Sequence, residues 1–544
     1  MIAALLVFLI TYVFVGLTQV PRVPINRPAG ALVGAVLMVV TGVLTLEQAF
    51  SAIDMHTLLL LLGMMIITVY LRRAGFFELM AERILSLART PVQLLVLVSL
   101  ASAVLSALFV NDTICLLFTP ILLEVTAQAG VNPVPYLLAL AMSSNIGSVM
   151  TATGNPQNML IGIASGIPYL TFLRALAPVA ILGILVSMAV IRWLYRREIT
   201  ARPFSRKPQV NIIRVNRPLL LKSLLVSAGV LVFFSIGHAY ALVAVAGAVV
   251  LMLVAKENTE QVLESVDWTL LLFFAGLFVV MHGVEVSGLA DALLRKAGAL
   301  KDASPAGRIA GFSLIAAVLS NVVSNVPAVM LLRPLVQALG NDNTLWLALA
   351  MSSTLAGNLT LIGSVANLIV VQQARKRAEI GFLEYLRAGV VITVMTIAIG
   401  IIVLSLQVRT AHGSEVSPAS AQSGPTMVAI EPANPLAATR TFKVVLLCDT
   451  EEKKVKGLQG FRRLRADEAA LFLFEPPKAV SFWMGSVNYP IDIIFVDPAG
   501  RAIAVYADLQ PKARDLYPAP APAAWAVETA AGSGIRVGDR VTVR

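Results

Sequence analysis

Four polar segments interrupt an otherwise apolar sequence, and their residue types suit the binding of an ion. They are residues 110–113 and 143–158 in the first half of the chain, and residues 324–327 and 352–367 in the second. Asn, Ser, Thr, Gly and Pro dominate them, and such clusters at membrane depth indicate unwound helices with freed backbone amides and carbonyls. Freed carbonyls and side-chain oxygens can ligate Na⁺, and the N-terminus of a half-helix can attract an anion. The chemistry predicted for these segments is ion or anion binding.

Twelve side chains in the four segments form the candidate binding site for a substrate or an ion. They are Asn111, Asp112, Thr113, Ser144, Asn145, Thr153, Asn155, Asn158, Ser324, Asn325, Thr354 and Asn367. A single Asn or Ser in a membrane helix often only hydrogen-bonds to a neighbouring helix, whereas four clusters in register favour a functional site. Asp112 is costly at membrane depth and should face a cavity or a partner. It would repel an anion unless it were protonated or held a cation.

Other ionisable residues of the apolar region have more than one interpretation. Asp54 and Asp267 each open an apolar run, which favours a helix N-cap over an ion ligand. His282 and Glu285 lie one helical turn apart, and they either relay protons or sit at the membrane interface. Arg333 either balances the charge of an anion or extends to the surface.

The elements that must position these residues occur twice. Residues 138–144, with the sequence LALAMSS, recur unchanged as residues 347–353. Asn111 matches Asn325 at an offset of 214, and Asn158 matches Asn367 at an offset of 209. Internal duplication builds many secondary transporters, which hold the solute between their two halves near the bilayer midplane.

Composition places the chain in a lipid bilayer. The 544 residues are 58% hydrophobic and 13% charged, whereas soluble proteins are about 25% charged. The net charge of +11 comes largely from Lys and Arg in short loops, which predicts orientation in the membrane rather than nucleic-acid binding. The two cysteines make no disulfide framework, and the sequence shows no metal-ligand spacing and no phosphate-binding loop. We therefore expect that the protein is not an enzyme, binds no cofactor and does not itself use ATP.

The fold class expected is an α-helical polytopic membrane protein with two inverted repeats, each with a re-entrant hairpin and a broken helix, followed by a small β-rich soluble domain. The basic loop at residues 192–217 should be cytoplasmic. That orientation requires residues 91–128 and 306–338 to be re-entrant hairpins that enter from opposite faces, as inverted repeats predict.

We predict five parts in a bacterial inner (plasma) membrane protein. They are transporter repeat 1 (1–195), a basic cytoplasmic linker (196–217), transporter repeat 2 (218–408), a flexible linker rich in Pro, Ala and Ser (409–440) and an extracytoplasmic β-rich domain (441–544).

The two hairpins and the broken helix resemble those of the ion transporter superfamily over roughly residues 1–408. The resemblance is carried by Asn-Asp-Thr at 111–113, Ser-Asn at 324–325 and Gly-Asn-Pro-Gln-Asn at 154–158. The superfamily holds citrate and divalent anion/Na⁺ symporters, arsenite permeases and a class of Na⁺/H⁺ antiporters, and homodimers are common in it.

The resemblance implies roles for the hairpin tips. In the dicarboxylate branch each tip bears Ser-Asn-Thr, which implies Na⁺ at Asn111 and Asn325 and points to Thr113 and Ser324 beside them. This chain departs from that pattern at Asp112, where Thr would stand, and also at positions 110 and 326, which are both Val. Its Asn-Asp tip is more similar to the arsenite-permease branch, which favours coupling to a cation or a proton.

Residues 441–544 resemble the bacterial family called domain of unknown function 192, whose members are generally extracytoplasmic. The motifs that carry this resemblance are residues 457–460 (GLQG), 482–484 (FWM), 490–495 (PIDIIF), Glu528 and 538–539 (GD). Alternating patterns predict strands at 442–447, 470–474, 480–483, 491–496, 502–507 and 540–543. Phe482, Trp483 and Met484 either line a ligand cleft, with Asp492 as a polar group inside it, or pack in the core.

The function expected is secondary active transport of a small inorganic or carboxylate anion, citrate- or dicarboxylate-like or arsenite-like. The transporter would be coupled to Na⁺ or H⁺ and would work by alternating access. One alternative is a Na⁺/H⁺ antiporter that uses Asp112. Another is a membrane ligand sensor whose outer domain acts as the reporter.

Overall fold

The computed structural model describes residues 2–16, 26–204, 215–237, 239–288, 300, 303–415, 427–433, 439–449, 453–454, 457–459, 461–484, 487–511 and 515–543. Parts of the two predicted linkers, residues 205–214, 416–426 and 434–438, lie outside this set, as does Gly460 of the GLQG motif. The chain forms two compact units, residues 1–415 and 416–544.

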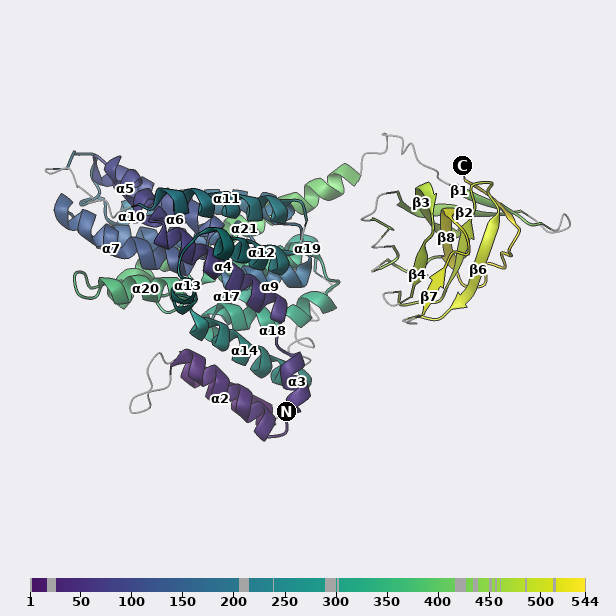
Figure 1. Cartoon of the computed structure of the whole chain (residues 1–544), viewed down its shortest axis with the longest axis horizontal. Helices are drawn as coiled ribbons and strands as arrows, with labels where there is room; N and C mark the ends of the chain where they lie inside the picture. The colour runs from purple at the N-terminus through teal and green to yellow at the C-terminus, as the bar shows by residue number, and fades with distance from the viewer. Residues whose placement is uncertain are drawn as a thin grey trace. The chain divides into compact units, whose positions relative to one another are not determined.

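All described secondary-structure elements of the first unit are helices (Figure 1). Its helices are α1 (Ile2–Gly16), α2 (Arg27–Val40), α3 (Leu46–Ser51), α4 (Met55–Arg73), α5 (Phe76–Ser86), α6 (Pro91–Leu108), α7 (Asn111–Ala129), α8 (Val134–Ser148), α9 (Pro156–Ser165), α10 (Tyr169–Leu194), α11 (Arg217–Ser235), α12 (Tyr240–Val254), α13 (Thr259–Glu264), α14 (Trp268–Val286), α17 (Pro305–Val323), α18 (Asn325–Ala338), α19 (Asn343–Ala356), α20 (Val365–Ala374) and α21 (Phe382–Glu415).

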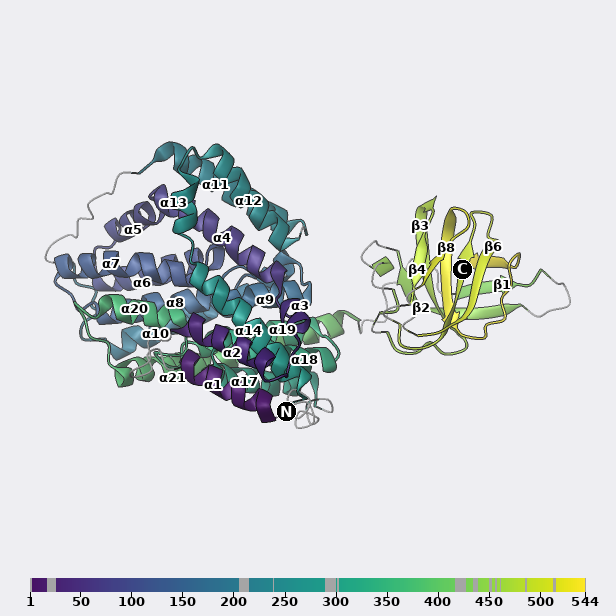
Figure 2. The same ribbon diagram turned by 60° about the horizontal axis from the view of Figure 1, so that its bottom comes forward.

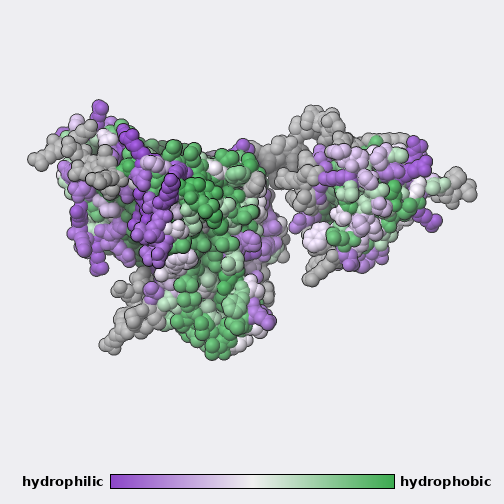
Figure 3. Space-filling view, viewed as in Figure 1, coloured by the Kyte–Doolittle hydropathy of each residue, from purple (hydrophilic) through white to green (hydrophobic). Residues whose placement is uncertain are grey.

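Eight helices among the described residues are long and apolar enough to cross a membrane. They are α4, α6, α7, α10, α11, α14, α17 and residues 382–408 of α21. The surface over α11, α12 and α14 is apolar, whereas the end of the unit near α5, α7 and α13 is hydrophilic (Figure 3). Leu225, Leu242 and Leu253 are 63%, 71% and 78% exposed. Such leucines need lipid around them, because a soluble protein would bury most of them.

Local capping explains where several helices begin. Asp54 caps α4 by accepting hydrogen bonds from the backbone amides of His56 and Thr57. Asp267 caps α14 in the same way through the amide of Leu270. The N-cap interpretation of both aspartates is confirmed.

The polar segments break two long helices at equivalent places. Residues 149–155 separate α8 from α9, and residues 357–364 separate α19 from α20. α6 packs along α8, and α17 packs along α19 in the other half. α20 lies against α7 and α8, so the second break adjoins the first hairpin (Figure 2).

Each predicted hairpin is a pair of helices joined by a short tip. α6 and α7 meet at Val110, and α17 and α18 meet at Ser324. Ser324 has φ 72° and ψ 162°, a region that side chains other than glycine rarely adopt. Re-entry of these hairpins and inversion of the repeats across a bilayer stay predictions.

The second unit is a β domain. Its strands are β1 (Met427–Glu431), β2 (Arg440–Cys448), β3 (Glu468–Lys478), β4 (Ser481–Trp483), β5 (Ile491–Val496), β6 (Ala502–Leu509), β7 (Leu516–Pro518), β8 (Ala523–Ala530) and β9 (Arg540–Val543). Seven strands form one sheet in the order β6-β5-β8-β3-β2-β1-β9, and β4 pairs with β7. β2 and β3 are parallel, and the other pairs are antiparallel.

All six predicted strands are present, but the prediction of a linker over residues 409–440 is wrong in two places. α21 continues to Glu415, and Met427–Glu431 forms β1. β1 buries its three central residues between β2 and β9. Its partner β9 lies more than 100 residues away in sequence, so a local pattern could not reveal the pairing. β8, the central strand, was also missed because its alanine-rich sequence has low β propensity.

Candidate functional site

The candidate site lies where the two helix breaks meet the two hairpin tips. Nine of the twelve predicted side chains are buried; the exceptions are Asp112 and Thr113, which are partly exposed, and Ser324, which is exposed. Sequence spacing placed the segments in register, and the fold determines which of their side chains touch.

Asn158 and Asn367 hold the two breaks with the same pair of hydrogen bonds. Asn158 Nδ2 donates to the carbonyls of the residues 10 and 7 positions before it, at 3.0 Å each. Asn367 Nδ2 donates to the carbonyls 10 and 7 positions before it, at 2.8 and 3.1 Å. These bonds satisfy backbone oxygens that an unwound helix leaves without partners. The duplication therefore extends to individual hydrogen bonds.

The two halves also exchange equivalent contacts. Asn145 Nδ2 donates to Asn367 Oδ1 at 3.0 Å. The corresponding pair is Thr354 and Asn158, which are the counterparts of Asn145 and Asn367. Thr354 Oγ1 lies 3.5 Å from Asn158 Oδ1. When residue i touches residue j of the other copy and their counterparts do the same, the contact has two-fold character.

Asn145 connects the first hairpin tip to the second break. Its Oδ1 accepts from Asn111 Nδ2 at 2.9 Å and from Ser364 Oγ at 3.1 Å. Its Nδ2 also donates to Asn358 Oδ1 at 2.8 Å. Every polar atom of this buried amide is thus engaged, which fixes its orientation.

Asn111 and Asn325, the equivalent residues at the two tips, each retain a buried carbonyl oxygen with no donor among the described residues. They are only 3% and 9% exposed. The backbone amide of Asn111 donates to the carbonyl of Gly154 in the first break at 3.0 Å. Asn325 lies against the second break, because a Cβ on Gly357 would come 3.2 Å from its Nδ2.

Two other predicted residues of the first half, Ser144 and Asn155, belong to the cluster, and Thr153 does not. Ser144 Oγ lies 2.7 Å from Ser106 Oγ and also donates to the backbone carbonyl of Asn111. Asn155 caps α9 and donates from Nδ2 to Thr354 Oγ1 at 3.2 Å. Thr153 points elsewhere, since its Oγ1 lies 3.4 Å from the hydroxyl of Tyr169.

The residues missed by the sequence are polar neighbours in the same segments. Gln157 Nε2 donates to Thr354 Oγ1 at 3.1 Å, and Asn358 and Ser364 both bond to Asn145. Their positions inside residues 143–158 and 352–367 were the available signal, but their side-chain directions could not be deduced from spacing.

Asp112 and Thr113 follow Asn111 in the first turn of α7, and both are partly exposed.

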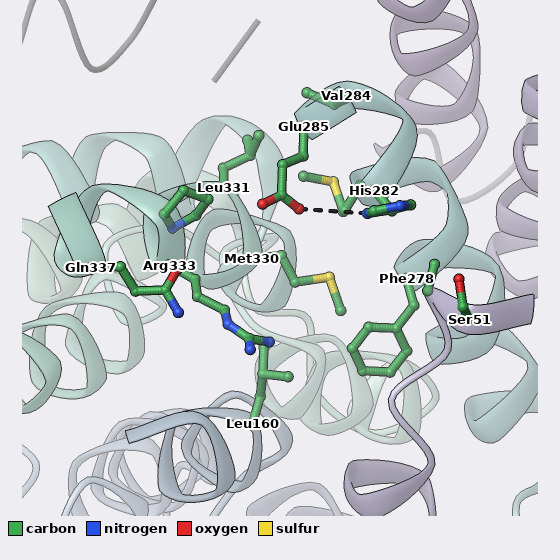
Figure 4. A pocket seen from close by; sticks show the side chains of 13 residues that line it. Ser51, Leu160, Phe278, His282, Val284, Glu285, Met330, Leu331, Arg333 and Gln337 are labelled. Atoms are coloured by element: carbon green, nitrogen blue, oxygen red, sulfur yellow. Dashed lines mark ion pairs between the residues drawn. The ribbon is translucent and has the colours of Figure 1, made fainter. Parts of the chain in front are cut away.

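A cavity of about 270 Å³ lies between α14 and the second hairpin. Arg333, Gln337, His282 and Glu285 line it, and His282 Nδ1 lies 3.6 Å from Glu285 Oε2 (Figure 4). The guanidinium of Arg333 reaches toward Leu160 of α9. His282, Glu285 and Arg333, three of the ionisable residues considered in the sequence, therefore share one cavity, which lies outside the amide cluster.

In the β domain, the predicted cleft residues separate. Phe482 and Trp483 line a cavity, whereas Met484 is fully buried in the core. Asp492 is buried and accepts hydrogen bonds from Asp508 N and from both N and Oγ of Ser533, so it organises loops.

Comparison with known proteins agrees with this architecture. The model of the citrate transporter family matches residues 6–351, and that of an uncharacterised family, domain of unknown function 192, matches residues 435–543. A silicon efflux transporter of rice (Oryza sativa subsp. japonica) is 32% identical over 451 residues, covering 70% of this chain and 93% of that protein.

Two further relatives extend the comparison. A putative transporter of Dictyostelium discoideum, named arsB, is 27% identical and covers 74% of this chain and 92% of its own length. The solved structure of the YdaH transporter of Alcanivorax borkumensis superposes with a TM-score of 0.50 at 15% identity, over 75% of this chain and 96% of that one, and shows a shared fold. The chain is therefore a multi-pass membrane transporter that belongs to the citrate transporter family and carries a C-terminal domain of the uncharacterised family 192.

Proposed function

We propose that this transporter moves a small anion or oxyanion by alternating access and couples that movement to Na⁺ or H⁺. The observation that carries the proposal is the pair of buried side-chain oxygens, Asn111 Oδ1 and Asn325 Oδ1, that have no donor among the described residues. Leaving a buried acceptor unpaired costs roughly 1–3 kcal/mol. Because the same cost occurs at two equivalent positions, a common function of the two oxygens is favoured. Coordination of a cation by both oxygens would be such a function.

The chemistry of the cluster favours an oxyacid over a highly charged carboxylate. Asp112 is the only charged residue among the twelve candidates, and the others are amides and hydroxyls. A trianion such as citrate would need compensating positive charge in this low-dielectric setting. A hydroxylated oxyacid can instead donate to and accept from neutral amides. The name of the rice relative, a silicon efflux transporter, agrees with this chemistry.

Asp112 supports coupling to a proton or a cation. It adjoins Asn111 at the tip and is partly exposed. Na⁺/H⁺ exchange is the second candidate function, and the same carboxylate would bind either cation in turn.

The cavity of Figure 4 supports an approach path for an anion. Arg333 supplies a guanidinium there, and His282 and Glu285 lie opposite it on α14.

The test is solute flux in proteoliposomes. Citrate, succinate, sulfate, arsenite and silicic acid are offered in turn with a Na⁺ gradient, a pH gradient or neither. Asn111→Ala and Asn325→Ala should each lower the coupled rate at least tenfold, whereas Asn132→Ala, which changes an exposed surface amide, should leave it unchanged.

The outcomes separate the alternatives. Wild-type rates in both tip variants would overturn the proposed site. Internal pH jumps driven by Na⁺ alone, with no solute carried, would establish Na⁺/H⁺ exchange instead. Saturable binding of a solute without net flux would identify a membrane sensor.

A further inference from the structure

The β domain contains a cleft of about 650 Å³ that lies outside the candidate transport site. That volume is in the range of sites that bind small organic molecules. Aromatic rings make up much of its wall: Phe472, Phe474, Phe482 and Trp483 all line it. The rings of Phe472 and Phe482 meet edge to face, with centroids 4.8 Å apart. This part of the wall is thus apolar, and Trp483 is 58% exposed at the domain surface.

A buried carboxyl group lines the same cleft. Glu528 lies on β8, the central strand, directly between Ala470 of β3 and Ile493 of β5. Its side chain is on the face that carries the aromatic core, and the residue is 4% exposed. Oε2 of Glu528 is buried and accepts no hydrogen bond from the described residues. An ionised carboxylate in such a place needs a cation and donors to stabilise it.

Two positively charged residues lie in another part of the lining. Lys454 and Lys478 both line the cleft, and their Nζ atoms lie 5.6 and 5.8 Å from the centre of the Phe474 ring. The cleft therefore presents one buried carboxyl group, an aromatic wall, and two ammonium groups beside Phe474.

We propose that this cleft binds a small zwitterion with a ring-sized apolar body, whose ammonium group reaches Glu528 and whose acidic group meets Lys454 and Lys478. The ammonium supplies both the charge and the donors that Glu528 Oε2 lacks. The ring fills the space between the aromatic side chains, and the acidic end remains near the lysines.

Binding of the ammonium should release a proton from Glu528. Burial raises the pKa of Glu528 to about 8, so the group is largely protonated at pH 7. An arriving cation favours the ionised form. Lys454 and Lys478 share the cleft with Glu528. The charge of Glu528 also acts on Cys448 and Tyr489, and burial raises the pKa of each of these two groups to about 12. Neither Cys448 nor Tyr489 changes its charge between pH 6 and pH 9, so the released proton reports Glu528.

The experiment uses the full chain in detergent and three probes. 4-(Aminomethyl)benzoate carries both ends on one ring, benzylamine carries only the amine, and benzoate carries only the acid. Titration calorimetry in buffers of different ionisation enthalpy gives the affinity and the number of protons released. We expect the zwitterion to bind at least tenfold more tightly than either one-ended probe, with proton release at pH 7 for both amines.

Matched variants assign the two ends. Glu528→Gln keeps the shape of the side chain and should abolish proton release and weaken both amines at least tenfold, while benzoate binds as before. The double variant Lys454→Gln and Lys478→Gln should weaken benzoate binding at least tenfold, while benzylamine binds as before and still releases a proton. Glu431→Gln, an exposed carboxylate on β1, should change nothing.

Two results would overturn the proposal. One is that none of the three probes has a dissociation constant below 10 mM, which corresponds to a binding free energy of about −2.7 kcal/mol. The other is that Glu528→Gln leaves amine binding and proton release unchanged. Retained benzoate binding shows that the variant cleft is folded. Transport rates should be independent of this site, so its failure would leave the proposed transport function standing.

Discussion

Gly63 of α4 and Gly276 of α14 occupy equivalent positions, and each packs its backbone against an alanine of the other half. A Cβ on Gly63 would lie 2.5 Å from the carbonyl carbon of Ala244, and one on Gly276 would lie 2.8 Å from that of Ala31. Ala31 and Ala244 are themselves separated by the same 213 positions as the two glycines. The halves therefore touch through reciprocal close approaches here as well as at the amide cluster.

These approaches predict the effect of a single methyl group. Gly63→Ala and Gly276→Ala should each destabilise the protein by about 1–3 kcal/mol, because backbone atoms must move to admit the Cβ. Gly229→Ala inside α11 is the control: its Cβ meets nothing within 4 Å, and alanine favours a helix. Thermal unfolding in detergent measures all three. Equal melting temperatures for wild type and the first two variants would contradict the packing.

The Asn145–Asn367 hydrogen bond predicts coupling between the halves. A double-mutant cycle with Asn145→Ala and Asn367→Ala should give an interaction energy of about 0.6–1.7 kcal/mol, the range for hydrogen bonds between membrane helices. The cycle is needed because Asn367 also holds the second break. Additive effects of the two substitutions would show that the bond does not link the halves.

Ser324 predicts a stabilising substitution at the second hairpin tip. Its φ of 72° with ψ of 162° suits glycine, so Ser324→Gly should relieve strain and raise stability by about 1 kcal/mol. Asn341, with φ 55°, is the comparison, because asparagine tolerates the left-handed region and should gain less from glycine. The denaturation midpoints of Ser324→Gly and Asn341→Gly, each compared with that of wild type, measure the two gains in stability. A loss of stability in Ser324→Gly would show that the serine conformation is not strained.

The pKa of Glu528 predicts how the β domain responds to pH. Burial raises it from 4.5 to about 8, so the folded domain holds a proton that the unfolded chain loses. The contribution of Glu528 to the free energy of unfolding is fully present below about pH 4.5 and is lost as the pH rises toward 8. Hydrogen bonds from Arg462 lower the pKa of Glu468 to about 2, so its contribution is constant between pH 5 and pH 9.

Hydrogen exchange of peptides from β3 and β8 can follow this loss. Between pH 5 and pH 9 the protection of wild type, corrected for intrinsic exchange rates, should fall. Glu528→Gln should remove most of that slope, and Glu431→Gln should not. A slope that survives in Glu528→Gln would assign the pH dependence to another group.

The predicted orientation can be tested with two single cysteines on exposed positions. Ala507→Cys in β6 should react with a membrane-impermeant maleimide added to intact cells, because the β domain is expected outside. Ala201→Cys, in the basic loop, should react only after the membrane is opened. The native Cys115 and Cys448 are buried and give a low background. Reversed labelling would place the C-terminal domain in the cytoplasm.

The sequence by itself determined the membrane class, the duplication, the four polar segments and the helix N-caps at Asp54 and Asp267. Each of these depends on neighbours within a few residues or on repetition along the chain, which a linear pattern records. Six strands of the β domain were predicted for the same reason.

Only the tertiary structure decided which polar groups meet. Asn145 bonds to Asn358 and Asn367 across more than 200 residues, and β1 pairs with the distant β9. Likewise, Asp492 proved to organise loops, whereas Glu528 faces the cleft. Such pairings depend on how separate elements pack, because packing alone brings remote side chains within hydrogen-bonding distance and removes others from water.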